Sequence, residues 1–320
     1  MNNLILLYKE LQDRGIPVPP AKSKVSGGCL RWGRNGRFWA RPLDLFDGWK
    51  VGDFSGEYLP QPIIVSEPST QYDELTKETK EKMKQLADKA LKTRAMEQAE
   101  ATKKALMLWC NSKKPIFHEY LYKKHIDLIP DDVRLSKFGE LVVPLHDARG
   151  NLMSLQFISD DGTKKFCKGC PKKGNFYLFG SLTDAHKNMI GICEGFATGA
   201  SLYDCLEIPI ICAMDAGNLE PTATLIRMKF PNLKILFFAD NDASSVNNTG
   251  LTKANEAKKV ISNCSVLFPS WSNHKFKSVD WNDIYCVVGK EIMKEKIMKA
   301  MADSVEEVEF VKGEKYEINI

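Results

Sequence analysis

The fold of this chain is decided by the segment MIGICEGFATG (residues 189–199), in which a short apolar run leads into Glu194. A second apolar run, ILFFADND (residues 235–242), ends in Asp240 and Asp242. In both segments the acids stand where a buried strand gives way to a loop. Ligands of open α/β sheets bind beyond the carboxyl ends of the strands, so we expect these carboxylates to converge in one crevice.

The order of the apolar runs around these acids predicts an α/β fold, with a mainly parallel sheet and helices on both faces. Strand-like runs lie at 189–193, 208–214, 233–239 and 264–269, and helix-like runs lie at about 197–206, 221–230 and 250–262. We therefore assign residues 185–290 to one α/β domain.

A cluster of carboxylates that includes no His or Cys forms a hard-oxygen site, which suits Mg²⁺ or Mn²⁺ and, through the cation, phosphate groups. Asp240 and Asp242 are two residues apart at a strand end, so both can face one side and hold one or two cations together. Asp280 and Asp283 follow the last strand of the domain and are further candidate ligands. The leading interpretation is phosphodiester chemistry.

Each acidic motif also has a purely structural explanation. Glu194 can be a helix N-terminal acid that interacts with the helix dipole. Asp240 and Asp242 suit an Asx-type turn, and the segment from Asp280 to Asp283 suits the start of a helix. The pairing of Glu194 with the Asp240–Asp242 motif in one β-α-β frame favours the functional interpretation.

A cluster of lysines lies upstream, among glycine turns and aromatic rings. Its members are Lys164, Lys165, Lys168, Lys172 and Lys173, with Phe166, Phe176 and Tyr177 nearby in sequence. Positive side chains beside stackable rings suit a nucleotide or a single-stranded nucleic-acid path. Solvated lysines on a hairpin are the alternative. The candidate substrate- and nucleic-acid-binding residues are Lys164, Lys165, Lys172 and Lys173.

The rest of the chain separates by composition. Residues 1–66 are rich in Gly, Trp, Phe and Arg, which predicts a small antiparallel sheet with tight turns. Residues 67–110 are dense in charge, which predicts a long solvated helix between two modules. Residues 111–184 alternate strands and turns, with a hairpin around Asp147. In residues 291–320 we expect the end of a helix, from about 289 to 302, and a tail to which we assign no structure.

The totals of the sequence set its broad class. A length of 320 residues suggests about two domains, and a net charge of +4 permits nucleic-acid binding without arguing for it. The 9 cysteines form no disulfide framework, which indicates a reducing, cytoplasmic setting. Cys167 and Cys170 have no second pair at suitable spacing, so no zinc is expected. No apolar stretch reaches membrane-spanning length, so we expect no membrane association.

The acidic motifs resemble those of a known domain. Glu194-Gly195, followed by Asp240-x-Asp242 after an apolar strand, resembles the Toprim domain of primases, topoisomerases and related nucleases. Upstream segments resemble the catalytic core of bacterial-type primases, in which a basic subdomain precedes Toprim; they are 142–152, 162–166 and 173–180. With its Glu-Gly-Phe-Ala-Thr-Gly and late Asp-Trp-Asn-Asp motifs, the chain is most similar to Toprim primases of phages and plasmids, over about residues 115–290.

This resemblance implies roles for the acids. Glu194 matches the Toprim glutamate, which acts in acid/base chemistry or metal binding. Asp240 and Asp242 match the metal-binding pair, and Asp283, with Asp280, matches a later acidic motif of primases. The implied cofactor is Mg²⁺ or Mn²⁺.

The resemblance also implies roles for two lysines, and the chain departs from the family pattern at two points. Lys165 and Lys173 match basic residues that contact nucleotide phosphates or template. Bacterial replicative primases carry an acid where this chain has Thr198. They also begin with a zinc ribbon, whereas residues 1–65 keep only Cys29, so this module resembles a zinc-less remnant.

The expected function is therefore that of a DNA primase, which synthesises short RNA primers from NTPs on single-stranded DNA for a mobile genetic element. A helicase or replication initiator would be supplied in trans, since the sequence has no Walker motif. Two alternatives use the same residues. One is a Toprim nuclease with water as the nucleophile, and the other is a catalytically silent nucleic-acid-binding module.

Overall fold

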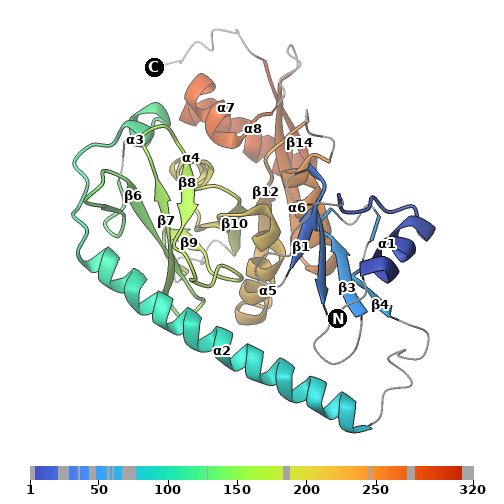
Figure 1. Ribbon diagram of the computed structural model, residues 1–320. Coiled ribbons are helices and arrows are strands. Elements are labelled where there is room, and N and C mark those ends of the chain that lie inside the picture. Colours follow the sequence, from blue (N-terminus) through green and yellow to red (C-terminus); the bar gives the residue numbers. More distant parts are fainter. Residues whose placement is uncertain are drawn as a thin grey trace. The chain divides into compact units, whose positions relative to one another are not determined.

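The structure is a computed structural model that describes residues 4–20, 29–34, 37–42, 48–55, 58–59, 61–66, 77–127, 129–182, 188–243, 245, 247–271 and 278–311 (Figure 1). The chain divides into two compact units, residues 1–94 and residues 95–320, which we call the N-terminal and the C-terminal unit. Within the described ranges, no helix combines the length and the apolar character that crossing a bilayer requires.

A six-stranded sheet forms the centre of the C-terminal unit, with the order β14-β13-β12-β10-β11-β9. The strands are β9 (Tyr177–Phe179), β10 (Met189–Cys193), β11 (Ile210–Cys212), β12 (Lys234–Phe238), β13 (Cys264–Trp271) and β14 (Glu307–Phe310). Strands β10 to β14 are parallel, and β9 is antiparallel to β11. The predicted mainly parallel α/β sheet is thus confirmed.

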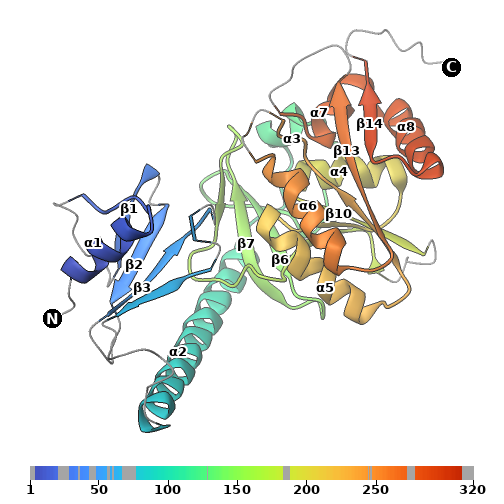
Figure 2. The same cartoon turned by 90° about the vertical axis from the view of Figure 1, so that its right-hand side faces the viewer.

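Helices cover both faces of this sheet (Figure 2). On one face lie α4 (Phe196–Leu206), α7 (Trp281–Val288) and α8 (Lys290–Asp303), and on the other lie α5 (Leu219–Lys229) and α6 (Thr249–Val260). Successive side chains of each strand point alternately toward the helices on one face and those on the other. Phe237 packs with α5 and α6, whereas Phe238 packs against Trp281 of α7 at a ring-centroid distance of 5.5 Å.

Two strands of the six-stranded sheet, β14 and β9, come from segments that the sequence analysis did not assign to it. The tail beyond the last helix contains β14, in which Val308 and Phe310 are buried and the alternating Glu307 and Glu309 are exposed. This alternation is an ordinary strand signal, and the tail is therefore structured at this point. Strand β9 comes from the upstream basic region and forms the other edge of the sheet.

The basic region itself is a four-stranded antiparallel sheet. Its strands are β5 (Arg134–Leu135), β6 (Leu141–His146), β7 (Leu152–Ile158) and β8 (Lys164–Phe166), preceded by α3 (Glu119–Lys123). The predicted hairpin joins β6 and β7, and the carboxylate of Asp147 accepts hydrogen bonds from the N–H groups of Arg149 and Asn151 in its turn. A backbone bridge from His146 to Phe176 holds this sheet beside β9.

The predicted charged helix is α2 (Lys77–Cys110). Its last turns pack on the antiparallel sheet, where Ala105 is fully buried against Val142 and Leu155. The indole N–H of Trp109 donates to the carbonyl of Asp132 at 2.8 Å. The C-terminal end of α2 is therefore part of the C-terminal unit, although most of its side chains there, like those of the earlier turns that the structure describes, are exposed.

The N-terminal unit contains the predicted antiparallel sheet and a helix that the sequence analysis did not anticipate. The sheet has the order β1-β2-β3-β4, with β1 (Leu30–Trp32), β2 (Phe38–Pro42), β3 (Gly48–Asp53) and β4 (Ile63–Ser66). Helix α1 (Leu4–Asp13) buries Leu7 and Leu11, which are four residues apart and so share one helical face. They pack on the inner side of the sheet with Trp49 and Val51.

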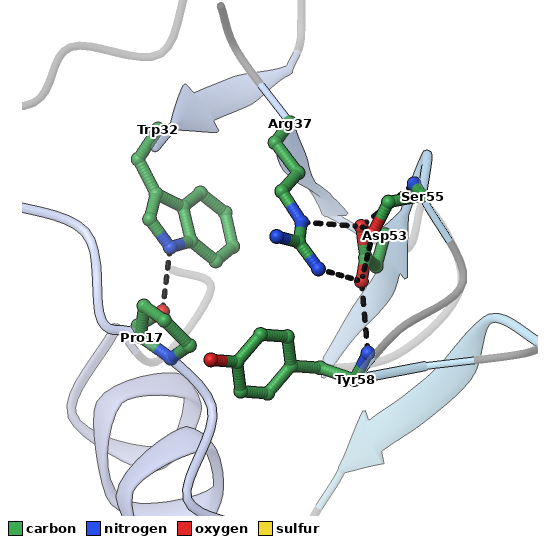
Figure 3. A network of polar contacts seen from close by, with 6 residues as sticks. All are labelled: Pro17, Trp32, Arg37, Asp53, Ser55 and Tyr58. Carbon is green, nitrogen blue, oxygen red and sulfur yellow. Dashed lines mark hydrogen bonds and ion pairs between the residues drawn. The ribbon is translucent and has the colours of Figure 1, made fainter. Parts of the chain in front are cut away.

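A polar network around Asp53 fastens the turn after β3 (Figure 3). The guanidinium of Arg37 donates to both carboxylate oxygens at 3.1 and 3.2 Å, and the N–H groups of Ser55 and Tyr58 donate at 2.8 and 3.0 Å. Burial acts to raise the pKa of Asp53, but these donors outweigh it and hold the pKa well below its usual range. Asp53 therefore remains a fully partnered carboxylate.

Close packing at the start of α4 gives a test of the C-terminal unit. A Cβ atom at Gly199 would lie 2.1 Å from the sulfur of Cys212 and 3.3 Å from the sulfur of Cys193. Gly199→Ala is therefore expected to lower the free energy of unfolding by roughly 1–3 kcal/mol, measured by urea denaturation. The loss should shrink in a Cys212→Ala background, where the nearest sulfur is gone. An equal loss in both backgrounds would contradict this packing.

Candidate active site

The first two acids lie at neighbouring strand ends. Strands β10 and β12 are paired in parallel with Cys193 opposite Phe238. Glu194 follows Cys193 directly, and Asp240 comes two residues after Phe238, so both carboxylates leave the same edge of the sheet. The structure thus brings together Glu194 and Asp240, which are 46 positions apart in the sequence.

A backbone bridge brings the later acidic motif to the same edge. The N–H of Asn241 donates to the carbonyl of Val279 at 2.9 Å, and the N–H of Val279 donates back to Asn241 at 3.0 Å. Asp280, the next residue, consequently lies beside Asp240. Its charge is the largest electrostatic influence on Asp240 after burial.

Among the acids of the cluster, Asp240 is the one whose negative charge is most disfavoured by its surroundings. Its Oδ1 atom is buried and has no hydrogen-bond partner in the described part of the chain. Burial raises the pKa of Asp240 well above its usual value, and the negative charges of Asp280, Glu194 and Asp242 raise it further. An unpaired buried carboxylate is costly unless a cation or a proton compensates it. The site therefore attracts positive charge.

The N-terminus of α6 lies directly against Asp240. A Cβ atom at Gly250 would lie 2.8 Å from the backbone oxygen of Asp240, so the helix approaches closely only because this residue is glycine. Asp242, two residues on, is held from two sides. Its N–H donates to the side chain of Asn248 at 2.8 Å, and the hydroxyl of Ser278 donates to its carboxylate.

Glu194 shares the electrostatics of the cluster and shows an acid that the sequence analysis missed. Burial raises the pKa of Glu194, and the charges of Asp215 and Asp242 raise it further, while Lys164 acts in the opposite direction. Asp215 follows β11, the other parallel neighbour of β10, and the N–H of Met214 donates to the carbonyl of Glu194 at 2.7 Å. The sequence could have identified Asp215 as a candidate, because it directly follows the predicted strand 208–214.

Asp280 and Asp283 have different positions. They form a capping box at the start of α7, in which the N–H of Asp283 donates to Asp280 at 2.7 Å and the N–H of Asp280 donates to Asp283 at 3.2 Å. Burial and the charge of Asp283 raise the pKa of Asp280. Asp283 itself is exposed and lies 3.4 Å from the amine of Lys124. The structure thus shows both the helix start and the approach of Asp280 to the cluster.

The buried amide of Asn282 fixes α7 in this position. Its Nδ2 atom donates to the carbonyl of Lys124 at 2.8 Å and lies 2.9 Å from the hydroxyl of Ser201 in α4. These bonds tie α7 to α3 and α4, and they orient Asp280 through the helix that it caps.

The four candidate lysines have different positions relative to the acids. Lys164 lies near the acids, because a Cβ atom at Gly195 would be 3.8 Å from its amine, and its charge opposes the raised pKa values of Glu194, Asp240 and Asp280. Lys172 lies 3.4 Å from Asp215.

The two lysines singled out by the resemblance have different surroundings. Lys165 points to the other face of β8, where its charge acts on Asp161. Lys173 is exposed and forms no ion pair within the described ranges. Of the four candidates, Lys164 and Lys172 are therefore the ones beside the acids at the sheet edge, Glu194 and Asp215.

The donors fit a hard divalent cation, although no three acidic, His or Cys side chains in the described ranges already form a closed metal cage. The acids of the cluster offer carboxylate oxygens, which Mg²⁺ and Mn²⁺ prefer. The orphaned Oδ1 of Asp240 and the mutual repulsion of the acids show that positive charge is what the cluster lacks.

Comparisons with known proteins point to one domain and one group of relatives. Residues 189–291 match the protein family described as Toprim domain. A protein named DNA primase TraC from Escherichia coli is 32% identical over 202 residues, which cover 59% of this chain and 19% of that protein. A second Escherichia coli protein of the same name is 30% identical over 239 residues, covering 70% and 16%. The chain thus spans less than a fifth of the length of these relatives.

A solved structure is similar over much of the chain. The crystal structure of the Aquifex aeolicus primase, with its zinc-binding and RNA polymerase domains, has 15% identity and a TM-score of 0.44, and the match covers 92% of this chain and 82% of that one. A likeness at this level does not decide a function.

Charge repulsion at Asp240 leads to a stability test without metal. In EDTA, Asp240→Asn is expected to raise the unfolding temperature, because it removes a buried unpaired charge. Because the folded-state pKa is raised, the penalty is absent below the unfolded-state pKa of about 4, grows as pH rises from there toward the folded-state pKa, and is constant above it. The advantage of the variant should therefore increase from about pH 4 to about pH 8 in thermal unfolding followed by circular dichroism.

Adding Mn²⁺ at about pH 8 should make the wild type unfold at a higher temperature than Asp240→Asn, because only the wild type is stabilised by binding the cation. A variant that is less stable than the wild type in EDTA at about pH 8 would show that Asp240 is satisfied in the folded protein.

Proposed function

Because residues 189–291 form a Toprim domain, we propose that this chain is a DNA primase, a nucleotidyltransferase that synthesises short RNA primers on single-stranded DNA. The observation that carries the proposal is the unneutralised carboxylate of Asp240 beside Glu194 and Asp280, with Lys164 nearby. Such a site suits metal-dependent phosphoryl transfer. Similarity to proteins named DNA primase TraC supports this choice among the reactions that carboxylate clusters perform.

Asp240 and Asp242 would hold Mg²⁺ or Mn²⁺, with Asp280 and Glu194 within reach of the same space. The chemistry that the cation supplies when bound is a lower pKa of the attacking 3′-hydroxyl and stabilisation of charge on the transferred phosphoryl group. Glu194 has a raised pKa, which suits it to accept a proton during attack.

The lysines complete the proposed site on the substrate side. Lys164 lies close to the acids and would bind a triphosphate oxygen of the incoming NTP, where its charge also offsets repulsion between phosphate and carboxylates. Lys172, beside Asp215 and 4.4 Å from the ring centroid of Phe166, would guide phosphate or template at the edge of the site.

The setting that we propose is replication of a mobile element in the cytoplasm. The resemblance of the acidic motifs to those of phage and plasmid Toprim primases supports the mobile-element role. We also propose that a helicase or replication initiator acts in trans.

Primer synthesis tests the proposed function. On a mixed-sequence single-stranded template with labelled NTPs and Mg²⁺ or Mn²⁺, the wild type should yield short oligomers. Asp240→Asn and Glu194→Gln should each reduce the yield roughly 100-fold or more, because each removes charge that acts in the transition state. Asp303→Asn, at an exposed end of α8, is the matched control.

Full activity of both variants would refute the assignment of these acids. Metal-dependent loss of template without oligomers would identify a nuclease instead. Neither product, together with intact DNA binding, would identify a non-catalytic module.

The two neighbouring lysines of β8 provide a sharper test of the substrate side. Lys164→Ala should raise the KM for NTP about 10-fold, as expected when a charged hydrogen bond to phosphate is lost. Lys165→Ala should have little effect on this KM, since its side chain leaves the opposite face of the strand. Steady-state kinetics on one template would decide, and a larger effect at Lys165 would overturn the geometric assignment.

A further inference from the structure

We propose that Cys167 and Cys170 are a redox-active dithiol, which a small-molecule disulfide converts reversibly into a disulfide bond across the turn that follows β8. The proposed primer synthesis gives no role to this Cys-Lys-Gly-Cys sequence. The turn joins β8, which carries Lys164, to the segment that carries Lys172, so oxidation acts on the connection between the two lysines beside the acids. The site goes beyond the proposed function, since it needs neither the acidic cluster nor a substrate.

The two cysteines occupy the first and last positions of one tight turn. The N–H of Cys170 donates to the carbonyl of Cys167 at 3.3 Å, and Gly169 between them has a φ of +82°, as the third residue of a type II turn does. The Cα atoms at the two ends of such a turn lie less than about 7 Å apart, which is within the reach of a disulfide bond. The backbone of the turn therefore already suits ring closure.

The two thiols lie on the same side of this turn. Both side chains pack against the apolar cluster of Ala105, Val142 and Leu155. Burial raises the pKa of Cys170 to about 12, and the thiol of Cys167 acts in the same direction, as expected of neighbouring sulfurs. Ring closure thus joins two groups that are already adjacent.

Hydrogen bonds on both sides of the turn hold it in place. The N–H of Cys167 donates to the carbonyl of Leu155 in β7 at 2.8 Å, and the side chain of Asn175 donates to the carbonyl of Pro171 at 3.1 Å. A fixed frame of this kind keeps the second thiol within reach of the first, and proximity makes an intramolecular reaction faster than its intermolecular counterpart. Closure of the ring is therefore favoured over a lasting adduct.

Access to solvent distinguishes this pair of cysteines from a second one. Cys167 and Cys170 are half-buried, and Lys168 between them is exposed. The sulfurs of Cys193 and Cys212 also lie close together, at 3.9 Å, but both residues are fully buried in the six-stranded sheet. A thiol reacts only where the oxidant can reach it. The pair in the turn is therefore the reactive one of the two, and the charge of Lys168 attracts anionic disulfides such as oxidised glutathione.

A metal site is the other common use of a Cys-x-x-Cys sequence. A structural zinc ion needs four ligands. Within the part of the chain that the structure describes, no third His, Cys, Asp or Glu side chain is placed to hold a metal ion with the two thiols. The pair on its own therefore suits thiol–disulfide chemistry, and disulfides of this kind in a reducing compartment are transient and typical of redox sensing or catalysis.

Oxidation proceeds by two thiol–disulfide exchanges. The thiolate of Cys167 attacks one sulfur of oxidised glutathione, so a mixed disulfide forms and one glutathione leaves. Cys170, whose pKa is raised, then loses its proton and attacks the Cys167 sulfur, and the second glutathione leaves with a proton. The protein loses two hydrogen atoms in all, and one molecule of oxidised glutathione is reduced to two molecules of glutathione.

Mass spectrometry of the full chain tests this assignment. The protein is equilibrated at increasing ratios of oxidised to reduced glutathione, its free thiols are trapped with N-ethylmaleimide, and a protease that cuts at aspartate leaves Cys167 and Cys170 in one peptide. This peptide should become lighter by two hydrogen atoms without any adduct, and dithiothreitol should reverse the change. In Cys170→Ser, Cys167 should carry a glutathione adduct instead, because no second thiol can displace it.

Cys110 is the matched control, because it is an exposed cysteine at the end of α2 without a Cys-x-x-Cys partner. It should gain a glutathione adduct only. The proposal is overturned if the wild-type peptide keeps free thiols at ratios that modify Cys110, or if its glutathione adduct persists without ring closure. Circular dichroism verifies that Cys170→Ser is folded. Absence of primer synthesis while this disulfide still forms would count against the proposed activity alone.

Discussion

Uncompensated negative charge at one edge of the parallel sheet is the constraint on which the rest of the site depends. Asp240 carries a buried oxygen without a partner, and Glu194, Asp242 and Asp280 add repulsion rather than relief. A protein keeps such an arrangement only where the surrounding structure is stable enough to hold it. Here that stability comes from apolar strands with helices on both faces.

The same helices also determine where each acid lies. The close approach of α6 at Gly250 limits the space behind Asp240. The capping box at Asp280 and the buried amide of Asn282 fix the start of α7 relative to α4. Asp280 therefore has two roles in the fold, since it caps a helix and contributes charge to the cluster.

Much of this arrangement follows from sequence patterns, and the remainder depends on tertiary geometry. Apolar runs located β10 and β12, and the strand-end rule located Glu194 and Asp240. The same rule applied to the strand before Asp215 would have added that residue. The choice between Lys164 and Lys165 could not be made, because it depends on which face of β8 turns to the acids, and a shift of one residue reverses it.

Manganese-soaked crystals of the full chain, measured for anomalous scattering, test the central claim most directly. The account predicts an anomalous peak within coordination distance of the carboxylates of Asp240 and Asp242, and its loss in Asp240→Asn. Absence of a peak there at a Mn²⁺ concentration that supports primer synthesis would contradict the claim that this acidic cluster is the metal centre.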